Sequence, residues 1–463
     1  MDIERTAYKN LLEWKSKRPN LAKAFMLKGP RQSGKTWLIR KFGKENYKSV
    51  VEINFHTDPA SRDIFSGSLS PDDIIMNISA QQLDAEFIPG NTLLFLDEIQ
   101  ECDRAYAALK PLAQDKRFDT IASGSLLGLG YKVSSASYPV GYVQEHILRP
   151  LSFLEFIKAL GIQQNVVDHL RQCMESKKEV NRSIHERLLS LWRTYVVVGG
   201  MPDAARTFIE TRTLGPVVEI QKTLHHDYEL DVMKYANKND VAKIKAIYDK
   251  IPITLASGSR RFMLSEIDKN ARYERYESGF AWLFDSGTVL PCLNVTEPVI
   301  PFEVNRERIL QKLFLSDVGM LCAQTLGGSQ FELLSGQGNI NPGYIWESAI
   351  AQELTAAGHE KLFYFDKKSV GEVDFLVCDG SGAVPIEIKS GKDWKRHKAL
   401  DRLLATRTWQ IGKAYVLSQG NVESDGPVTN LPWYMSMFLA PADLDTAIDF
   451  PDLSQIGDQL NGK

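Results

Sequence analysis

The sequence predicts an α/β fold that begins with a mostly parallel sheet covered by helices on both faces. Short apolar runs alternate with helical patterns through the first 150 residues, as they do in such sheets. The first run, residues 24–27, leads into the pattern G-x-x-x-x-G-K-[ST], formed here by residues 29–36. A later apolar run, residues 93–96, ends in two carboxylates. Parallel sheets bind ligands beyond the carboxyl ends of their strands, so both features predict a site at one edge.

The composition is that of an ordinary globular protein. The chain has 463 residues, of which 43% are hydrophobic and 24% charged, and its formal net charge is −3. This charge excludes a global basic field for nucleic acid, so any such binding needs local patches. The five cysteines are widely spaced and form no C-x-x-C pair, which argues against a zinc site or a disulfide framework. No stretch approaches about 18 apolar residues, and the charged N-terminus lacks a signal core, so we expect a cytoplasmic protein without membrane contact.

The elements of the first region follow from local periodicity. Tyr8, Leu11 and Trp14 recur at helical spacing before Pro19 and predict a leading amphipathic helix. After the strand at 24–27, four further strands are predicted at residues 49–55, 92–96, 118–123 and 145–148. Helical patterns separate them, for example at residues 79–87 and 104–115. We assign residues 1–160 to this domain.

After Pro150 the sequence pattern changes from alternating strands and helices to mainly helices. We assign residues 161–326 to a helical and winged-helix region. Within it, residues 262–267 open one helix, residues 276–285 form another, and residues 288–293 follow as a short β-ribbon. Helix, helix and β-wing is the order of a winged-helix module. A generic helical subdomain fits the same pattern equally well.

A third α/β region follows a segment rich in Gly, Ser and Asn at residues 327–342, which we interpret as a linker. A helix is predicted at residues 344–357, with strands near 361–365, 373–378 and 384–389. Residues 327–440 form this region, and residues 441–463 form an acidic tail.

The loop after the first strand predicts a phosphate cradle with ATP and Mg²⁺ as its ligands. The loop would surround the phosphates with backbone N–H groups, which all of its residues except Pro30 carry. It consists of Gly29, Pro30, Arg31, Gln32, Ser33, Gly34, Lys35 and Thr36. Lys35 would reach the β- and γ-phosphates, and the Thr36 hydroxyl would hold Mg²⁺. The alternative is an ordinary strand-to-helix turn with a chance lysine.

Two carboxylates and a hydroxyl complete this predicted site. Asp97 would bind Mg²⁺ through water, and Glu98 would act as the general base on the attacking water. The next predicted strand ends with two hydroxyls, those of Ser123 and Ser125, and one of them would contact the γ-phosphate or the attacking water. An ordinary strand exit is the alternative for Ser123.

Several segments together resemble a known family, the prokaryotic AAA-type ATPases, related to archaeal ATPases, that carry a C-terminal restriction-endonuclease-like domain. These segments keep the family's order and are residues 28–36, 96–100, 123–125, 150–156, 199–202 and 315–319. The resemblance implies an AAA-type ATPase core, a winged-helix middle region and a nuclease-like end. The family usually has Gly-Arg where this chain has Gly141-Tyr142, which puts γ-phosphate sensing in doubt unless Arg149 substitutes.

The C-terminal region contains a second chemical pattern. Two adjacent strands would bring Asp374 and Glu387 together, with Lys389 on the same face as Glu387. Two carboxylates would bind Mg²⁺ or Mn²⁺, and the lysine would orient water in phosphodiester cleavage. These residues resemble the Asp…Glu-x-Lys core of restriction-like nucleases, in which Glu347 matches the additional helical acid. The alternative is a retained fold that binds DNA or a partner without cutting it.

Basic residues follow this pattern and suggest DNA as a partner. They are Lys389, Lys392, Lys395, Arg396, Lys398 and Arg402. Trp394 lies among them, either as a stacking platform for bases or packed inward beneath a solvated helix face.

We therefore expect an Mg²⁺-dependent ATP-binding protein and ATPase coupled to DNA binding or processing. A homo-oligomer is one expected state, because AAA-type sites often borrow an arginine from a neighbouring subunit. Two alternatives remain at this point: an ATP-gated, metal-dependent nuclease, and a nucleotide-switched DNA-binding or scaffold protein with little turnover.

Overall fold

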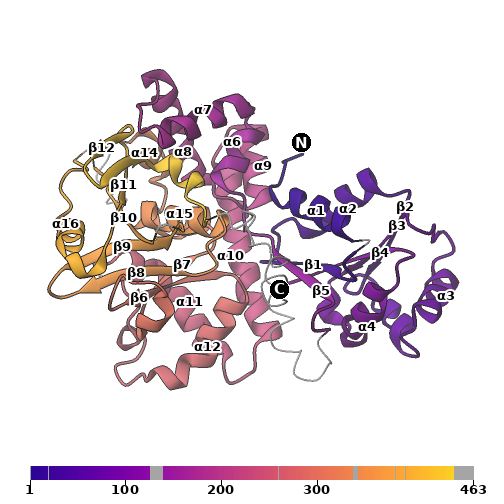
Figure 1. Cartoon of the computed structure of the whole chain (residues 1–463). Helices are drawn as coiled ribbons and strands as arrows, with labels where there is room; N and C mark the ends of the chain where they lie inside the picture. Colours follow the sequence, from indigo (N-terminus) through magenta and orange to yellow (C-terminus); the bar gives the residue numbers. More distant parts are fainter. Residues whose placement is uncertain are drawn as a thin grey trace, which may run out of the picture.

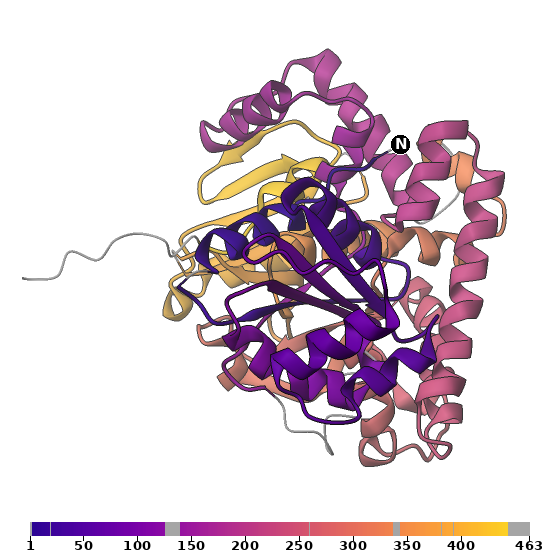
Figure 2. The ribbon, with the colours of Figure 1, turned by 90° about the vertical axis from the view of Figure 1, so that its right-hand side faces the viewer.

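The computed structural model describes residues 2–18, 20–125, 139–258, 260–336, 343–380, 382–391 and 393–442. Two β-sheets form its frame. In Figure 1 the smaller sheet lies on the right, the larger sheet lies on the left, and helix α10 runs between them. Figure 2 shows the N-terminal domain, in indigo, in front of the larger sheet.

The smaller sheet confirms the predicted parallel α/β core. Its five strands run in the order β2-β3-β4-β1-β5, and every pairing within it is parallel. The strands are β1 (Ala24–Gly29), β2 (Ser49–Asn54), β3 (Thr92–Asp97), β4 (Asp119–Ser125) and β5 (Val143–Ile147). Each predicted strand agrees with an observed one to within a few residues, because fully apolar runs bounded by polar residues are typical of buried parallel strands.

Helices cover both faces of this sheet. On one face, α1 (Ala7–Lys17) and α2 (Lys35–Asn46) pack against Phe25 and Leu27 of β1. On the other face, α3 (Pro71–Gln81) and α4 (Asp103–Gln114) share a core with the alternate residues Ala24 and Met26. Two 3₁₀ turns, η1 (Pro59–Phe65) and η2 (Ile99–Glu101), complete the domain.

Helix α3 begins earlier than the helical pattern predicted at residues 79–87. The Ser70 side chain accepts the backbone N–H of Asp73, and Pro71 occupies the first helical turn. A serine cap followed by proline is a strong start signal that periodicity alone does not detect. The predicted pattern therefore overlaps only the end of α3.

Seven helices lie between Pro150 and β6 (Val289–Val295) in the described residues. They are α6 (Phe153–Ala159), α7 (Gln164–Glu175), α8 (Arg182–Val198), α9 (Pro202–Thr211), α10 (Gly215–Tyr235), α11 (Val241–Ala256) and α12 (Tyr273–Asp285). Ser152 and Glu155 form a capping box at the start of α6. The predicted helix start at residues 262–267 is instead the 3₁₀ turn η3 (Leu264–Glu266), and α12 begins three residues before the predicted helix.

The larger sheet has the strand order β12-β13-β11-β10-β9-β8-β6-β7. Its strands are β6 (Val289–Val295), β7 (Arg306–Leu315), β8 (Leu362–Lys367), β9 (Gly371–Cys378), β10 (Ala383–Ile388), β11 (Ala414–Ser418), β12 (Glu423–Asp425) and β13 (Val428–Pro432). The accompanying helices are α13 (Val318–Thr325), α14 (Gln330–Ser335), α15 (Gly343–Ala356) and α16 (Lys398–Ala405), with the 3₁₀ turns η4 (Phe302–Asn305), η5 (Arg407–Trp409) and η6 (Trp433–Phe438).

The predicted winged-helix ribbon is part of this larger sheet. β6 and β7 pair antiparallel, and β6 also pairs in parallel with β8 of the C-terminal region. The hairpin is therefore two strands at one end of an eight-stranded sheet and not a free-standing wing. Its hydrophobic residues are buried on the shared core, which local sequence cannot reveal.

The boundary predicted at residues 326 and 327 crosses a single hydrophobic core. Residues of α8, α10 and the hairpin share one buried cluster with α15, β9 and η6. Part of the predicted linker is α14, whose Leu333 is buried in the same cluster. Residues 337–342 and the predicted acidic tail from residue 443 onward lie outside the described residues.

A search of the helices in the described ranges finds none that combines the length and the apolar character needed to cross a bilayer.

A buried polar junction joins the exit of the first sheet to α15. Glu353 of α15 accepts the backbone N–H of Phe153 at 2.9 Å and the hydroxyl of Tyr195 at 2.7 Å. Gln352 donates to the same hydroxyl at 2.9 Å. Burial raises the pKa of Glu353 to about 7, and its Oε2 atom is buried without a hydrogen-bond partner.

Glu353 predicts a pH-dependent stability. Its unfolded pKa is about 4.3, so between about pH 4 and pH 7 the folded chain binds more protons than the unfolded chain, and stability falls as pH rises. Replacing Glu353 with Gln removes the buried charge, so we expect the variant to melt above wild type at pH 8 and to lose part of the slope between about pH 5 and pH 7. Thermal unfolding at several pH values measures this. The exposed Glu360→Gln is the control, and a Glu353→Gln variant with the wild-type slope would contradict the assignment.

Candidate functional site

The predicted phosphate loop connects the end of β1 to the start of α2. Gly34 has φ +91° and Gln32 has φ +60°, so the loop curls through left-handed conformations. Gly29 is required for a different reason, because a Cβ atom there would lie 2.4 Å from the carbonyl oxygen of Leu148. Lys35 begins α2, so the loop directs the N-terminus of that helix toward the space in front of it.

Lys35 is folded back onto its own loop. Its Nζ donates to the carbonyl oxygens of Gly29 at 3.1 Å and Pro30 at 2.8 Å, and the residue is 6% exposed. Burial lowers the pKa of Lys35, and the carboxylates of Glu98 and Asp97 oppose this effect. The two carbonyls hold the ammonium beside the cavity.

Asp97 is the centre of a hydrogen-bond network at the carboxyl edge of the sheet. The Thr36 hydroxyl donates to its Oδ2 at 3.0 Å, Asn54 donates to the same atom at 2.9 Å, and the Ser123 hydroxyl donates to Oδ1. Burial raises the pKa of Asp97, while the hydrogen bond from Ser123 lowers it. The structure thus brings together Thr36 and Asp97, two oxygen donors of the kind that Mg²⁺ takes along with water and phosphate oxygens.

Ser123 has a different place from the one predicted for it. It is fully buried and binds Asp97, and it is not among the residues that line the cavity. Ser125, two residues further along β4, lines the cavity instead, and its Oγ atom is buried without a hydrogen-bond partner. Both predicted hydroxyls thus lie at the end of β4, one on Asp97 and the other on the cavity.

Glu98 follows β3 in a strained conformation. Its φ is +54°, in the left-handed region that non-glycine residues seldom occupy. The side chain lines the cavity, and Gln100 donates a hydrogen bond to its Oε2. Backbone strain of this kind is retained where the surroundings hold a functional side chain in place. The carboxylate is thus fixed on the cavity wall, next to the carboxylate of Asp97.

The cavity in front of the loop has a volume of about 340 Å³ and extends over three parts of the chain. The loop and the ends of β3 and β4 form its floor, and the N-terminal segment contributes Ile3 and Arg5. Helices α9 and α10 close it with Pro202, Arg206 and Tyr235. This volume is within the usual range for small-molecule sites. The residues supplied by α9 and α10 were not predicted, because nothing local marks a contact across about 170 to 200 positions of sequence.

Helix α10 holds the variable residues of the phosphate loop. Asp231 forms an ion pair with Arg31, Asp227 accepts a hydrogen bond from Gln32 at 2.9 Å, and the Tyr228 hydroxyl donates to the Arg31 carbonyl at 3.2 Å. Burial raises the pKa of Asp231, and the charge of Arg31 lowers it. The loop is therefore fixed from outside its own domain.

Arg5 joins the phosphate loop to the start of α6, the helix that follows the first sheet. Its guanidinium donates to the carbonyl of Ser33 at 2.9 Å and forms an ion pair with Glu155 at 3.3 Å. Glu155 belongs to the capping box that starts α6. Arg5 is 6% exposed, so this bridge lies inside the protein.

The missing Gly-Arg pair has a structural explanation. Tyr142 lies at the opposite edge of the sheet, where its carbonyl accepts the N–H of Ala24 at the start of β1. A side chain there is far from the carboxyl edge, and Arg149 is not among the residues that line the cavity. Arg206 of α9 does line it. Its recorded ion pair is with Asp203 on the same helix, at 3.0 Å.

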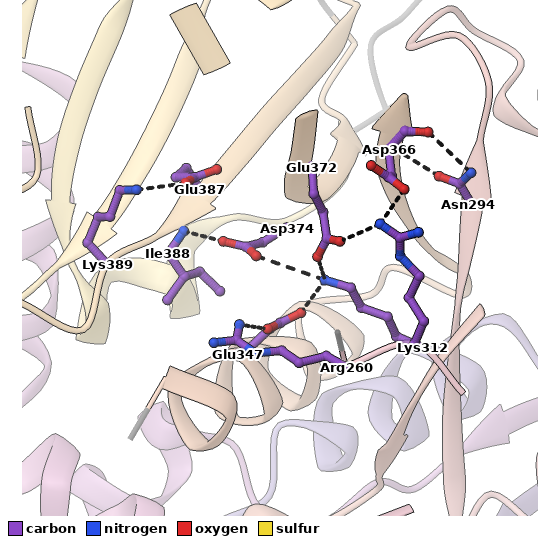
Figure 3. Close-up of polar contacts among 11 residues, drawn as sticks. Arg260, Asn294, Lys312, Glu347, Asp366, Glu372, Asp374, Glu387, Ile388 and Lys389 are labelled. Atoms are coloured by element: carbon purple, nitrogen blue, oxygen red, sulfur yellow. Dashed lines mark hydrogen bonds and ion pairs between the residues drawn. The ribbon is translucent and has the colours of Figure 1, made fainter. Parts of the chain in front are cut away.

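The second predicted site is partly assembled. Glu347 on α15 and Asp374 on β9 lie close together, and Glu372 of the same strand joins them, as Figure 3 shows. Glu387 instead pairs with Lys389 at 2.8 Å. Burial raises the pKa of Asp374, and the charges of Glu347 and Glu387 add to this effect. Glu372 was overlooked in the sequence, although its spacing of two residues from Asp374 places both on one face of β9.

The basic segment near this site is largely paired. Trp394 is 6% exposed and packs inward on Leu400 and Val416, so it is not a stacking platform. Lys395 pairs with Glu423 and Arg396 pairs with Asp393. Lys392 lies outside the described residues.

Comparisons with known proteins agree with the N-terminal assignment. Residues 21–157 match a family model described as an AAA domain. Residues 189–330 and 342–434 match two domains of unknown function, DUF8612 and DUF4143. The curated proteins include no match to this chain.

Similar solved structures share low sequence identity with the chain. A Walker-type ATPase of Pyrococcus abyssi is 13% identical, with 70% of this chain and 96% of that chain covered and a TM-score of 0.42. The RuvB Holliday junction branch migration motor of Thermotoga maritima is 14% identical, with 62% and 89% covered and a TM-score of 0.28. The Orc1 protein of Aeropyrum pernix in complex with DNA is 12% identical, with 71% and 94% covered and a TM-score of 0.27.

Proposed function

We propose that this protein binds ATP with Mg²⁺ in the cavity beneath α9 and α10 and hydrolyses it. The observation that carries the proposal is the direct contact between the Thr36 hydroxyl and Asp97, 3.0 Å apart, with Lys35 and Glu98 on the same cavity. A buried hydroxyl–carboxylate pair beside a lysine and the N-terminus of a helix suits a metal–phosphate ligand.

Binding would exchange one set of partners for another. The Lys35 ammonium would leave the carbonyls of Gly29 and Pro30 and turn to the β- and γ-phosphates, while the loop N–H groups surround them. The clamp of α10 on Arg31 and Gln32 keeps the loop in shape while this happens. Little reorganisation of the backbone is then required, which favours affinity.

The residues of this chain divide the chemistry among them. Thr36 and Asp97 would hold Mg²⁺, which when bound neutralises charge on the β- and γ-phosphate oxygens. Glu98 would accept the proton of the attacking water as general base, with its carboxylate held by Gln100. Ser123 positions Asp97 through its hydrogen bond and does not itself need to reach the nucleotide.

We assign the phosphate-sensing role to Arg206. Three arginines line the cavity, but Arg5 is bonded to the loop and α6, and Arg31 is bonded to Asp231. Arg206 is exposed and pairs with a neighbour on its own helix, so it is free to turn toward a phosphate. An arginine on the closing helix would stabilise negative charge as the γ-phosphate is transferred.

We further propose that hydrolysis is coupled to DNA. The resemblance of the C-terminal region to restriction-endonuclease-like domains supports this. A nucleotide-switched protein with slow turnover is the second candidate. It is favoured by the contacts of α10 with the loop residues Arg31 and Gln32.

The paired variants Lys35→Ala and Glu98→Gln separate binding from turnover. We expect Lys35→Ala to abolish detectable ATP binding in calorimetry, because the loop loses its phosphate cation. Glu98→Gln should keep wild-type affinity but lose hydrolysis by about 100-fold or more, since a general base contributes that much. Unchanged ATP affinity in Lys35→Ala, or undiminished phosphate release in Glu98→Gln, would refute these roles.

Arg206→Ala tests the closing helix. We expect phosphate release to fall by about tenfold or more, because charge stabilisation by arginine in such sites is large. Arg182→Ala is a matched control, since Arg182 is an exposed helical arginine with an ion pair to Glu186. Equal turnover in both variants would remove Arg206 from the mechanism.

Coupling to DNA is tested by ATP turnover with and without duplex DNA, read beside the mass of the protein in solution. We expect DNA to raise the rate, and a homo-oligomer to be visible in the mass. A rate that does not respond to DNA would contradict the coupling, and slow turnover combined with ATP-dependent DNA affinity would favour the switch.

A further inference from the structure

The acidic cluster of the C-terminal region surrounds a buried lysine. Lys312 of β7 places its Nζ 2.5 Å from Glu347, 2.7 Å from Glu372 and 3.9 Å from Asp374. The side chains of Lys312 and Glu347 are both fully buried. Figure 3 shows the ammonium between the three carboxylates; Glu387 lies on the side of Asp374, and no dashed line joins Glu387 or Lys389 to the cluster.

The remaining oxygen atoms of the cluster are also occupied. The second oxygen of Glu347 pairs with Arg260, and the second oxygen of Glu372 lies 3.2 Å from Arg261. Asp374 accepts the backbone N–H of Ile388 at 2.7 Å through its other oxygen. A divalent ion would need several of these atoms as ligands, and each already has a partner.

Each carboxylate of the cluster has a cationic partner. Glu347, Glu372 and Asp374 face Lys312, Arg260 and Arg261, and Arg261 is shared with a fourth carboxylate, Asp366. Although burial lowers the pKa of Lys312, the charges of Glu347 and Glu372 outweigh that effect and raise it overall. The ammonium lies within ion-pair distance of Glu347 and Glu372, so a divalent ion would have to displace it to reach these carboxylates. Glu347, Glu372 and Asp374, with their oxygen atoms already paired, do not fit the metal that a nuclease-like site implies. Of the predicted acidic residues, Glu387 alone keeps a buried oxygen, Oε2, without a hydrogen-bond partner in the described part of the chain.

We propose that Lys312 is the resident cation of this cluster: its ammonium takes the position between Glu347, Glu372 and Asp374 that a divalent metal would take. The C-terminal region is then not a metal-dependent nuclease. Its acidic residues instead fasten β7 and the segment at Arg260 to α15 and β9. The segment lies beside β7, since the N–H of Phe262 donates to the carbonyl of Gln311 at 3.0 Å.

Lys312 links the hairpin β6–β7 to the acidic residues of the nuclease-like pattern in the same sheet. Lys312 comes from the hairpin, outside the region predicted to form the nuclease-like domain, and reaches the cluster from there. Removing one partner from a buried ion cluster leaves the others uncompensated. The lysine thus makes the hairpin a structural requirement for the acidic residues.

The first test uses the wild-type full chain without nucleotide. Mn²⁺ is titrated by calorimetry into wild type and into Asp374→Asn. We expect identical isotherms, because no Mn²⁺ binds these carboxylates. Mn²⁺ binding in wild type that Asp374→Asn abolishes would overturn the proposal, as would Mn²⁺-dependent cleavage of plasmid DNA that the same variant lacks.

The second test removes the resident cation. In Lys312→Ala we expect Mn²⁺ affinity to rise at least about tenfold over wild type, since three carboxylates are then available. Tb³⁺ should show luminescence sensitised by Tyr364, whose ring centre lies 4.9 Å from the wild-type Nζ, and adding Tyr364→Phe should remove it. Lys361→Ala, an exposed lysine next to β8, is the control. A folded Lys312→Ala protein that binds neither ion would overturn the proposal, and the wild-type titration decides the question if this variant does not fold.

Discussion

The close approach of two backbone segments at the carboxyl edge of the first sheet organises the rest of the molecule. Gly29 ends β1 directly against the carbonyl of Leu148, with no space for a side chain between them. The phosphate loop and the chain leaving β5 are therefore in contact. The departing chain starts α6, and Arg5 binds both the loop and the capping box of that helix. Helices α9 and α10 then return over the same loop and close the cavity.

Helix α15 connects this edge with the larger sheet. At one end of the helix, Gln352 and Glu353 bind Tyr195 and the start of α6. At the other end, Glu347 binds Lys312 and Arg260. The two buried carboxylates differ in their partners. Glu347 pairs with Lys312 and Arg260, whereas Glu353 has no cationic partner among the described residues and burial raises its pKa to about 7. Helix α15 thus contacts Tyr195 and the start of α6 through Glu353, and it contacts the cations beside the larger sheet through Glu347.

The features predicted from sequence were those encoded locally. The loop at Gly29 to Thr36, the strand ending in Asp97 and the parallel order follow from short patterns with a physical meaning. Arg206 and Asp231 could not be predicted as parts of the cavity, since their contacts depend on how distant helices pack. Lys312 is one of several charged or polar residues in β7, and its role depends on a hairpin that pairs across a predicted boundary. Strand pairing at that distance has no local signal.

We propose that ATP binds in the cavity that α9 and α10 close over the phosphate loop. Hydrogen exchange of the full chain with and without ATP and Mg²⁺ tests it most directly. We predict slower exchange with ATP and Mg²⁺ in the loop at residues 29–36. We predict the same for the facing parts of α9 and α10, at residues 202–206 and 227–235. Protection confined to the loop, or no change in either segment, would contradict it.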